Sequence, residues 1–420
     1  MNCNQAPTRV VVTGMGMVTP LGSNLDAFSH LLLNGQSAAN KISIFDPAQL
    51  PTQIAAEVTD FTPIKEFPDR KVSFAVSAAK AAIIDADKTV LKDADKDGTA
   101  ILHYYKNLRS QLSIGIGLEL FSMPDMLDYL NHSEVATDSH SLSHIQTPSD
   151  ICAHLISDEF NLNRPPLIHV SACAASTDAL GSAFRALRSD HCDWMLAGGT
   201  DSMINPLGVG GFSKLQALTR RNSAPEQASR PFDRDRDGFL LGEGAGFLVL
   251  EKLQNALQRG ASIYGEIVGF ANSFDAHGIS EPHPQGDGAY LAMRKAIADA
   301  QLSPELIAHI SAHGTSTPKN DIIETKAIHR LFKKAASNIS VNATKSMIGH
   351  LISASGVVEV GALLACASKG ALHPSINIDH ADNLCDLDYI SEGQRAFTGG
   401  YCLKNSFGFG GQNSSLVLKI

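Results

Sequence analysis

The sequence lacks any pair of cysteines with the spacing of a zinc site. Its seven cysteines stand far apart, at positions 3, 152, 173, 192, 366, 385 and 402, whereas structural zinc ligands come in closely spaced pairs. An odd number of scattered cysteines in a chain of 420 residues indicates reduced thiols, as in intracellular proteins. We therefore expect free cysteines, which form neither a zinc cluster nor a disulfide framework.

Long apolar runs and an excess of positive charge are also missing. No run reaches the roughly 18 uncharged apolar residues of a membrane span. The first nine residues are mostly polar, and the short apolar stretch after them is interrupted by glycine, unlike a secretory signal peptide. The formal net charge of -9 argues against nucleic acid as the main partner, because phosphate binding needs a dominant basic face. We expect a soluble cytoplasmic protein, in which local basic patches can still bind an acidic protein partner.

Short apolar runs alternate with helical patterns along the whole chain. The strand-like runs cover residues 10–13, 113–116, 167–170, 194–197 and 246–250 in the first half, and 263–270, 307–311, 339–342, 401–403 and 415–419 in the second. Such alternation predicts a layered α/β architecture with largely parallel strands and covering helices. The similar order of elements in residues 1–260 and 261–420 suggests an internal duplication.

Cys173 is the first candidate for chemistry, in the run VSACAAS at residues 170–176. The pattern places it between a strand and a helix, where free N–H groups and the positive end of the helix dipole stabilise a thiolate. The small neighbours leave space for a substrate to reach the sulfur. A buried, inert cysteine is the alternative interpretation.

Three runs in the second half strengthen the case for a catalytic site. His313 lies in SAHGTST at 311–317, Lys345 and His350 lie in NATKSMIGH at 342–350, and NSFGFGG at 405–411 predicts a glycine-rich turn. Each has an ordinary alternative: a hydrogen-bonded histidine, a solvated lysine, an irregular strand end. Their joint occurrence, each at a strand-to-loop junction, favours one shared site.

Two aspartate-rich runs resemble a calcium-binding loop without completing it. The run DRDRDG at residues 233–238 has Gly244 at the twelfth position, where the loop needs a bidentate glutamate. The run DADKDG at 93–98 has Tyr104 there. We therefore reject calcium and expect turns stabilised by aspartate side chains.

Together with GGT at 198–200, PLGVGGF at 206–212 and the run from Arg230 to Gly244, these motifs resemble the β-ketoacyl-acyl-carrier-protein synthases of type II fatty acid and polyketide systems, especially synthase II. The resemblance covers nearly the whole chain. It implies the thiolase fold, two duplicated α/β halves in five layers (α-β-α-β-α), usually as a homodimer or with a related subunit. It also implies decarboxylative Claisen condensation of an acyl thioester with malonyl-acyl carrier protein, without metal or organic cofactor.

The resemblance assigns roles to individual residues. Cys173 would accept the acyl group, and His313 and His350 would assist decarboxylation and stabilise the enolate, which needs placed N–H donors. The N–H groups of Cys173 and Phe409 would form the oxyanion hole, with Phe409 also a mobile gate. Lys345 and Glu359 would form an ion pair with an electrostatic and structural role.

The acyl pocket differs most from synthase II. Leu118 falls on the usual apolar gate, but Glu119 and Leu120 replace glycines, and Gln146 stands where synthase II has an aromatic residue. Added volume in a close-packed wall and an unpaired amide both disfavour a long alkyl chain. We expect short, polar or conjugated primers to react faster than long saturated ones; the alternative interpretation is that Glu119 points to solvent and the pocket is ordinary. Transacylation rates with butyryl, octanoyl and tetradecanoyl carrier proteins test this; equal rates for the shortest and longest chains would refute it.

Basic residues near the family's docking positions are candidates for binding an acidic acyl carrier protein. They are Lys65, Arg70, Lys71, Lys214, Arg220 and Arg221. Gln216 stands where synthase II often has arginine, and scattered solvated charges are the alternative interpretation.

Three other functions fit the sequence less well. A thiolase would need a second catalytic cysteine in the glycine-rich turn, where Phe409 stands. A chain-length factor, the non-catalytic partner of a ketosynthase, would lack the nucleophile that Cys173 supplies. A cysteine hydrolase would leave His350 and Lys345 without a role.

Overall fold

The computed structural model describes residues 8–64, 69–87, 102, 104–117 and 150–420. Within these residues, eleven strands form one mixed sheet in the order β12-β10-β9-β14-β15-β8-β1-β7-β6-β4-β5. The strands are β1 (Val10–Val18), β4 (Ser110–Ile116), β5 (Leu167–His169), β6 (Trp194–Ser202), β7 (Glu243–Lys252), β8 (Gly265–Phe274), β9 (Ile307–Ser311), β10 (Ser340–Asn342), β12 (Asp388–Tyr389), β14 (Tyr401–Gly408) and β15 (Gln412–Lys419). Two short ribbons, β2 (Asn40–Lys41) with β3 (Ile54–Ala55) and β11 (Ala371–Leu372) with β13 (Arg395–Ala396), lie outside this sheet.

The sheet contains the same pattern twice. In the first half β5, β4 and β6 run parallel, and β7 is antiparallel to both β6 and β1. In the second half β10, β9 and β14 run parallel, and β15 is antiparallel to both β14 and β8. The halves join where β1 pairs with β8. The expected duplication is confirmed, whereas its boundary between residues 260 and 261 stays a prediction.

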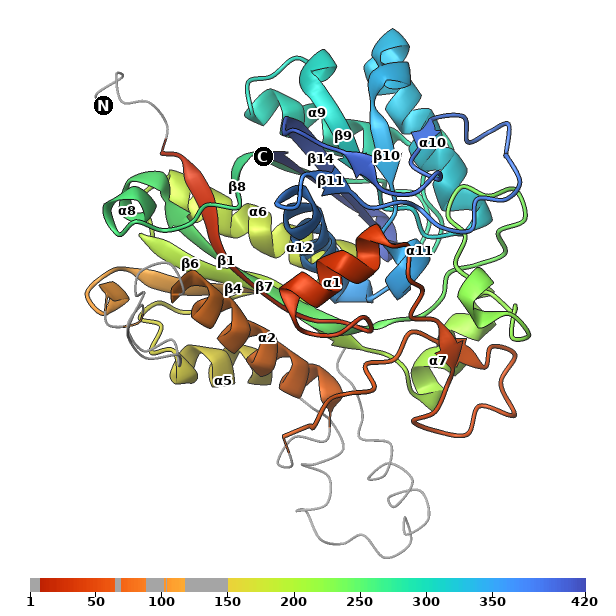
Figure 1. Cartoon of the computed structure of the whole chain (residues 1–420), viewed down its shortest axis with the longest axis horizontal. Coiled ribbons are helices and arrows are strands. Elements are labelled where there is room, and N and C mark those ends of the chain that lie inside the picture. The colour runs from red at the N-terminus through yellow and green to blue at the C-terminus, as the bar shows by residue number, and fades with distance from the viewer. Residues whose placement is uncertain (1–7, 65–68, 88–101, 103, 118–149) are drawn as a thin grey trace, which may run out of the picture.

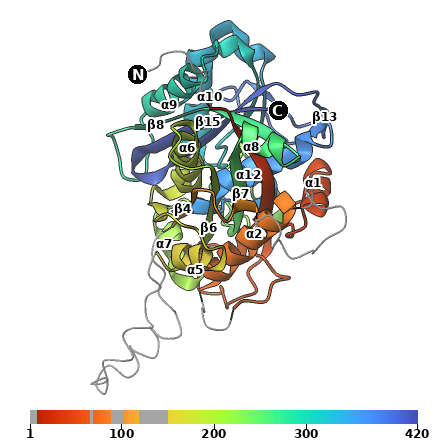
Figure 2. The same ribbon diagram turned by 90° about the vertical axis from the view of Figure 1, so that its left-hand side faces the viewer.

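Helices complete five layers (Figures 1 and 2). Two central helices, α6 (Ala175–Arg188) and α12 (Ser355–Ala367), pack between the two halves of the sheet. The outer face of the first half is covered by α2 (Arg70–Asp87) and α5 (Ile151–Glu159), and that of the second half by α9 (Asp287–Asp299) and α10 (Pro318–Phe332). This is the thiolase-like arrangement that the resemblance implied. The shorter helices are α1 (Leu25–Leu33), α7 (Pro206–Lys214), α8 (Leu253–Gln258) and α11 (Lys345–Ile348).

The apolar character of α12 follows from its central place. Every residue from Ser355 to Cys366 is buried, so all sides of this helix face other protein layers. No helix in the described ranges is both long enough and apolar enough to cross a membrane.

Several strands are longer than their apolar runs predicted, β1 and β14 among them. The first was expected to end at Thr13, but β1 continues to Val18, because Gly14 and Gly16 serve the contact with α2. A Cβ at Gly14 would lie 2.4 Å from the Ala82 carbonyl oxygen, and one at Gly16 would lie 2.1 Å from that of Ala78. These glycines mark close helix–strand packing and not a turn.

The glycine-rich run 405–411 is also only partly a turn. Its first four residues continue β14, and the turn is the 3-10 segment Phe409–Gly411. The prediction of a turn over the whole run was therefore wrong. Pairing with β15 keeps Asn405 to Gly408 in the strand.

Candidate active site

Cys173 lies in a 3-10 turn, Ala172–Ala174, between β5 and α6. Ala172 has φ of 48°, a left-handed conformation that non-glycine residues rarely adopt. The Cys173 side chain, only 4% exposed, lines a cavity of about 320 Å³. The sequence pattern predicted a stabilised thiolate, but burial acts in the opposite direction. It raises the pKa of the Cys173 thiol to about 11, against the lowering effects of the Lys345 charge and the Phe409 N–H.

His350 is the nearest titratable partner of the thiol. Its Nε2 lies 3.1 Å from the Cys173 Sγ. The backbone N–H of Ile352 donates to His350 Nδ1 at 3.1 Å, and the Ser355 hydroxyl lies 2.9 Å from the same atom. Since Nδ1 accepts from an N–H, a neutral His350 carries its proton on Nε2 and presents it to the cavity.

His313 is oriented in the same way by a different group. The two imidazole rings lie 5.4 Å apart at nearly right angles, and the Lys345 Nζ lies 3.4 Å from His313 Nδ1. An ammonium group only donates, so the proton of His313 also belongs on Nε2. Burial, reinforced by the positive charge of Lys345, holds the pKa of His313 and of His350 well below the usual histidine value.

Lys345 is itself fixed by two further hydrogen bonds. Its Nζ donates to the His313 carbonyl oxygen at 2.7 Å and to Glu359 Oε1 at 2.5 Å. Lys345 begins α11 and Glu359 lies in α12, and both are buried. The structure thus brings together the two residues that the resemblance paired.

Two charged residues of this cluster were not singled out from the sequence. Lys404, in β14, places its Nζ 2.7 Å from Glu359 Oε2. Glu324, in α10, accepts the backbone N–H groups of His313 and Gly314, each at 2.9 Å. A lone lysine inside the apolar start of β14 was the available signal for Lys404, while nothing in the helical pattern of α10 set Glu324 apart.

Phe409 stands at the turn that follows β14, beside the nucleophile. Its backbone N–H is directed at Cys173 and lowers the pKa of that thiol. The approach depends on Gly408, because a Cβ there would lie 2.9 Å from the Ser171 carbonyl oxygen and 3.2 Å from the Cys173 nitrogen. Phe407 and Phe409 both line the cavity, together with Cys173 and the two histidines.

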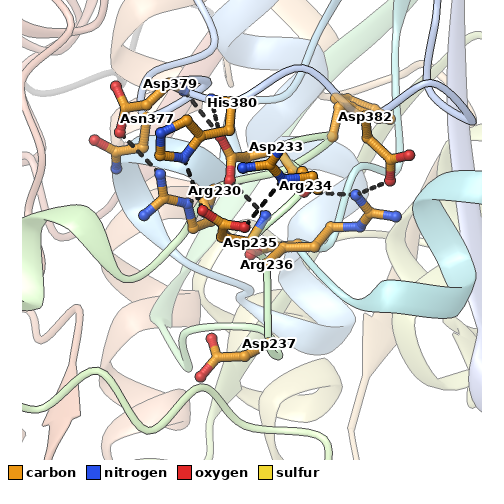
Figure 3. A network of polar contacts seen from close by, with 12 residues as sticks. Arg230, Asp233, Arg234, Asp235, Arg236, Asp237, Asn377, Asp379, His380 and Asp382 are labelled. Carbon is orange, nitrogen blue, oxygen red and sulfur yellow. Dashed lines mark hydrogen bonds and ion pairs between the residues drawn. The ribbon is translucent and has the colours of Figure 1, made fainter.

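The segment from Arg230 to Gly238 is held by ion pairs and hydrogen bonds with Asp379, His380 and Asp382 (Figure 3). The Asp233 carboxylate accepts four hydrogen bonds, from Arg230 Nε and from the backbone N–H groups of residues 235, 379 and 380. Asp233, Asp235 and His380 lie close enough to share a cation, but these four donors already occupy both Asp233 oxygens. Gly238 N–H donates to the Ser316 carbonyl, which ties the segment to the His313 loop.

The predicted docking residues differ in how far they are exposed. Lys71 is fully buried and paired with Asp69, so it cannot contact a partner protein, and its assignment was wrong. A buried position in α2 gives the same sequence signal as an exposed one, which explains the error. Arg70 is largely engaged by Glu243, with 21% of its side chain exposed.

Three docking candidates lie near the mouth of the cavity. Lys214 and Arg220 are exposed and Arg221 is half-buried. Lys214 directly precedes Leu215, which lines the cavity, and Arg220 donates its backbone N–H to Asp237, which also lines it. The other calls, on Lys65, Leu118, Glu119, Leu120 and Gln146, lie outside the described residues.

Comparisons with known proteins agree with this geometry. The family model described as the N-terminal domain of beta-ketoacyl synthase matches residues 7–256, and that of the C-terminal domain matches residues 264–379. The 3-oxoacyl-[acyl-carrier-protein] synthase 2 of Synechocystis sp. is 39% identical, covering 99% of both chains, and that of Coxiella burnetii is 36% identical, covering 98% of both.

Solved structures give the same result. A type II polyketide ketosynthase, in complex with its acyl-carrier protein and bound to the hexaketide, superimposes with a TM-score of 0.85 at 30% identity over 99% of both chains. A β-ketoacyl synthase from Burkholderia phymatum superimposes equally well, at 0.85 and 31% identity over 98% of this chain and 99% of that one.

Proposed function

The chain belongs to the β-ketoacyl synthase family, and we propose that it condenses an acyl group held on Cys173 with malonyl-acyl carrier protein. The observation that carries this proposal is the convergence of the Cys173 thiol, two Nε2–H groups and the Phe409 N–H on one cavity. Acyl transfer needs the thiol as nucleophile and N–H donors that stabilise the oxyanion. Decarboxylation needs a second set of donors for the enolate.

In the first half-reaction, the Cys173 sulfur attacks the carbonyl carbon of the donor thioester. The new S–C bond forms, the donor sulfur leaves, and the thiol proton ends on that leaving group. Negative charge on the carbonyl oxygen is stabilised by the backbone N–H groups of Cys173 and Phe409. Both N–H groups act on the Cys173 sulfur, since each lowers the pKa of the thiol.

In the second half-reaction, the C–C bond to the malonyl carboxylate breaks and CO2 leaves. The bonding electrons form an enolate, whose oxygen accepts hydrogen bonds from His313 and His350 Nε2–H. The enolate carbon attacks the acyl carbonyl on Cys173, and the C–S bond breaks to release the β-ketoacyl product and the thiolate. Because their lowered pKa values keep both imidazoles neutral, they stabilise the enolate as hydrogen-bond donors and not as cations.

The same cavity favours this function over its alternatives. A non-catalytic partner subunit would have no use for a thiol within 3.1 Å of an imidazole. A thiolase would need a second cysteine, and among the described residues that line the cavity Cys173 is the one cysteine. Incubation with acyl- and malonyl-carrier proteins should yield β-ketoacyl product and CO2 in equal amounts. Release of free fatty acid instead would indicate a hydrolase and overturn the proposal.

The exposed Lys214 and Arg220 beside the cavity mouth are the proposed contacts for an acidic carrier protein. Opposite charges at this rim would guide the carrier and its bound acyl arm toward Cys173. The preference for short or polar primers is also a proposal. The residues on which it depends lie outside the described part of the chain.

A homodimer is the proposed assembly, formed at the edge of β5. Among the described residues β5 pairs with β4 alone, and an unpaired edge strand invites pairing with another chain. Ile168 in β5 is 37% exposed, and Val170 just after it is 62% exposed. We expect Val170→Asp to shift the sedimentation coefficient from dimer toward monomer, with Leu257→Asp, at an exposed site in α8, as the control. A monomeric wild-type chain would contradict this assembly.

A further inference from the structure

Lys404 is a buried charge to which the reaction steps above give no role. It lies in β14 between Leu403 and Asn405, and none of its surface is exposed. Its Nζ lies 2.7 Å from Glu359 Oε2 and also donates to the Asn405 carbonyl oxygen. Removing a lysine from water is costly unless the charge is paired, so a fully buried lysine beside an active site calls for a function.

The charges that face Lys404 come from three other elements. Glu359 in α12 binds Lys345 of α11 through its other oxygen. Glu324 in α10 accepts N–H groups from the backbone of His313 and Gly314 and from the Asn405 side chain. Lys404 interacts electrostatically with both glutamates and with Lys345. Its positive charge also helps to lower the pKa of His313 and of His350.

A count of these charges shows what Lys404 contributes. With both glutamates ionised, the two lysines and two glutamates sum to zero. Without Lys404 the cluster would hold two carboxylates against the single ammonium of Lys345. That leaves one net negative charge behind His313, where Coulomb repulsion would oppose a second negative charge on the enolate.

We propose that Lys404 is a positioning residue for condensation: it balances the buried carboxylates of Glu359 and Glu324, and so keeps net negative charge away from the enolate oxygen held by His313 and His350. The inference rests on the proposed function. It concerns the decarboxylation half-reaction only, because acyl transfer to Cys173 uses the backbone N–H groups of Cys173 and Phe409 in place of the two imidazoles.

Lys404→Met tests the proposal, since methionine keeps most of the length and volume of lysine and removes the charge. We expect malonyl decarboxylation to fall about tenfold in kcat, while self-acylation of Cys173 stays within about twofold. Loss of a nearby positive charge raises the pKa of His313 and His350. A protonated histidine would carry a hydrogen on Nδ1, facing the Lys345 ammonium at His313 or the Ile352 N–H at His350. The acid limb of the decarboxylation pH profile should therefore move to higher pH.

Two further variants separate this role from a structural one. Lys71→Met removes another fully buried lysine, paired with Asp69, and should leave the acid limb where it is in the wild type. Adding Glu324→Gln to Lys404→Met restores electrical neutrality, so the double variant should regain part of the lost decarboxylation rate. This rescue is specific to charge balance, because losses from damaged packing would add.

The outcomes are distinct. A folded Lys404→Met variant with wild-type decarboxylation and an unmoved acid limb would overturn the proposal. So would equal losses in both half-reactions, or a double variant worse than either single one. If Lys404→Met does not fold, Lys404→Gln and its pairing with Glu324→Gln provide the same comparison. A wild-type protein that takes up acyl groups but never decarboxylates malonyl thioester would instead refute the proposed function.

Discussion

A Cys173→Ala variant is expected to lose condensation by about 10⁴-fold or more, because removal of a covalent nucleophile abolishes the intermediate on which both half-reactions depend. The Cys173 side chain is 4% exposed and lies in a turn at the cavity, so its loss should change the free energy of unfolding by about 1 kcal/mol or less. Product formation from acyl- and malonyl-carrier proteins measures the first effect, and chemical denaturation measures the second.

The matched control is Cys152→Ala. Cys152 is fully buried in α5, and burial raises the pKa of its thiol to about 12. It contributes nothing to the cavity that Cys173 lines, so its replacement should leave condensation near the wild-type rate. A Cys173→Ala variant that still condenses at a measurable fraction of that rate would show that another group carries the acyl chain.

His313→Ala and His350→Ala are each expected to lower malonyl decarboxylation by about 10²–10³-fold, the usual cost of removing one placed donor to a developing oxyanion. Self-acylation should persist in both variants, since the enolate exists only in the second half-reaction. Release of CO2 from malonyl-carrier protein and uptake of acyl groups by the enzyme measure the two halves separately.

His309 provides a matched control for these variants. It is equally buried, but it binds Ser340 and Asn342 and does not line the cavity. His309→Gln should lower the stability of the fold without changing the ratio of the two half-reactions. Condensation at nearly the wild-type rate by either the His313 or the His350 variant would mean that its assigned role is wrong.

Sequence reasoning found the reacting groups because their motifs stand at the ends of strands. Cys173 follows β5 and His313 follows β9, and the carboxyl ends of such strands are where α/β folds place functional loops. Resemblance to a family supplied what periodicity could not, namely that Lys345 should meet Glu359 across 14 residues. The structure confirms this contact, with the Lys345 Nζ donating to Glu359 Oε1.

The same reasoning failed where the outcome depends on partners from distant elements. Lys71 and Lys214 look alike in the sequence, yet Lys71 is a buried residue of α2 and Lys214 is an exposed residue of α7. Lys404 and Glu324 meet their partners only because β14 and α10 pack beside α12 and the His313 loop. Local pattern records neither the neighbour across a sheet nor the charge that neighbour brings, so the balance of this buried cluster became visible only in three dimensions.

Peptide mapping after a single acyl transfer tests the central claim most directly. The protein is incubated with an acyl-carrier protein thioester, digested at acidic pH to preserve thioesters, and analysed by tandem mass spectrometry. The structure predicts one acyl group per chain, located on Cys173 and removed when malonyl-carrier protein is added. An acyl group on Cys152 or Cys192, or acyl turnover without any covalent adduct, would contradict the assignment of Cys173 as the nucleophile.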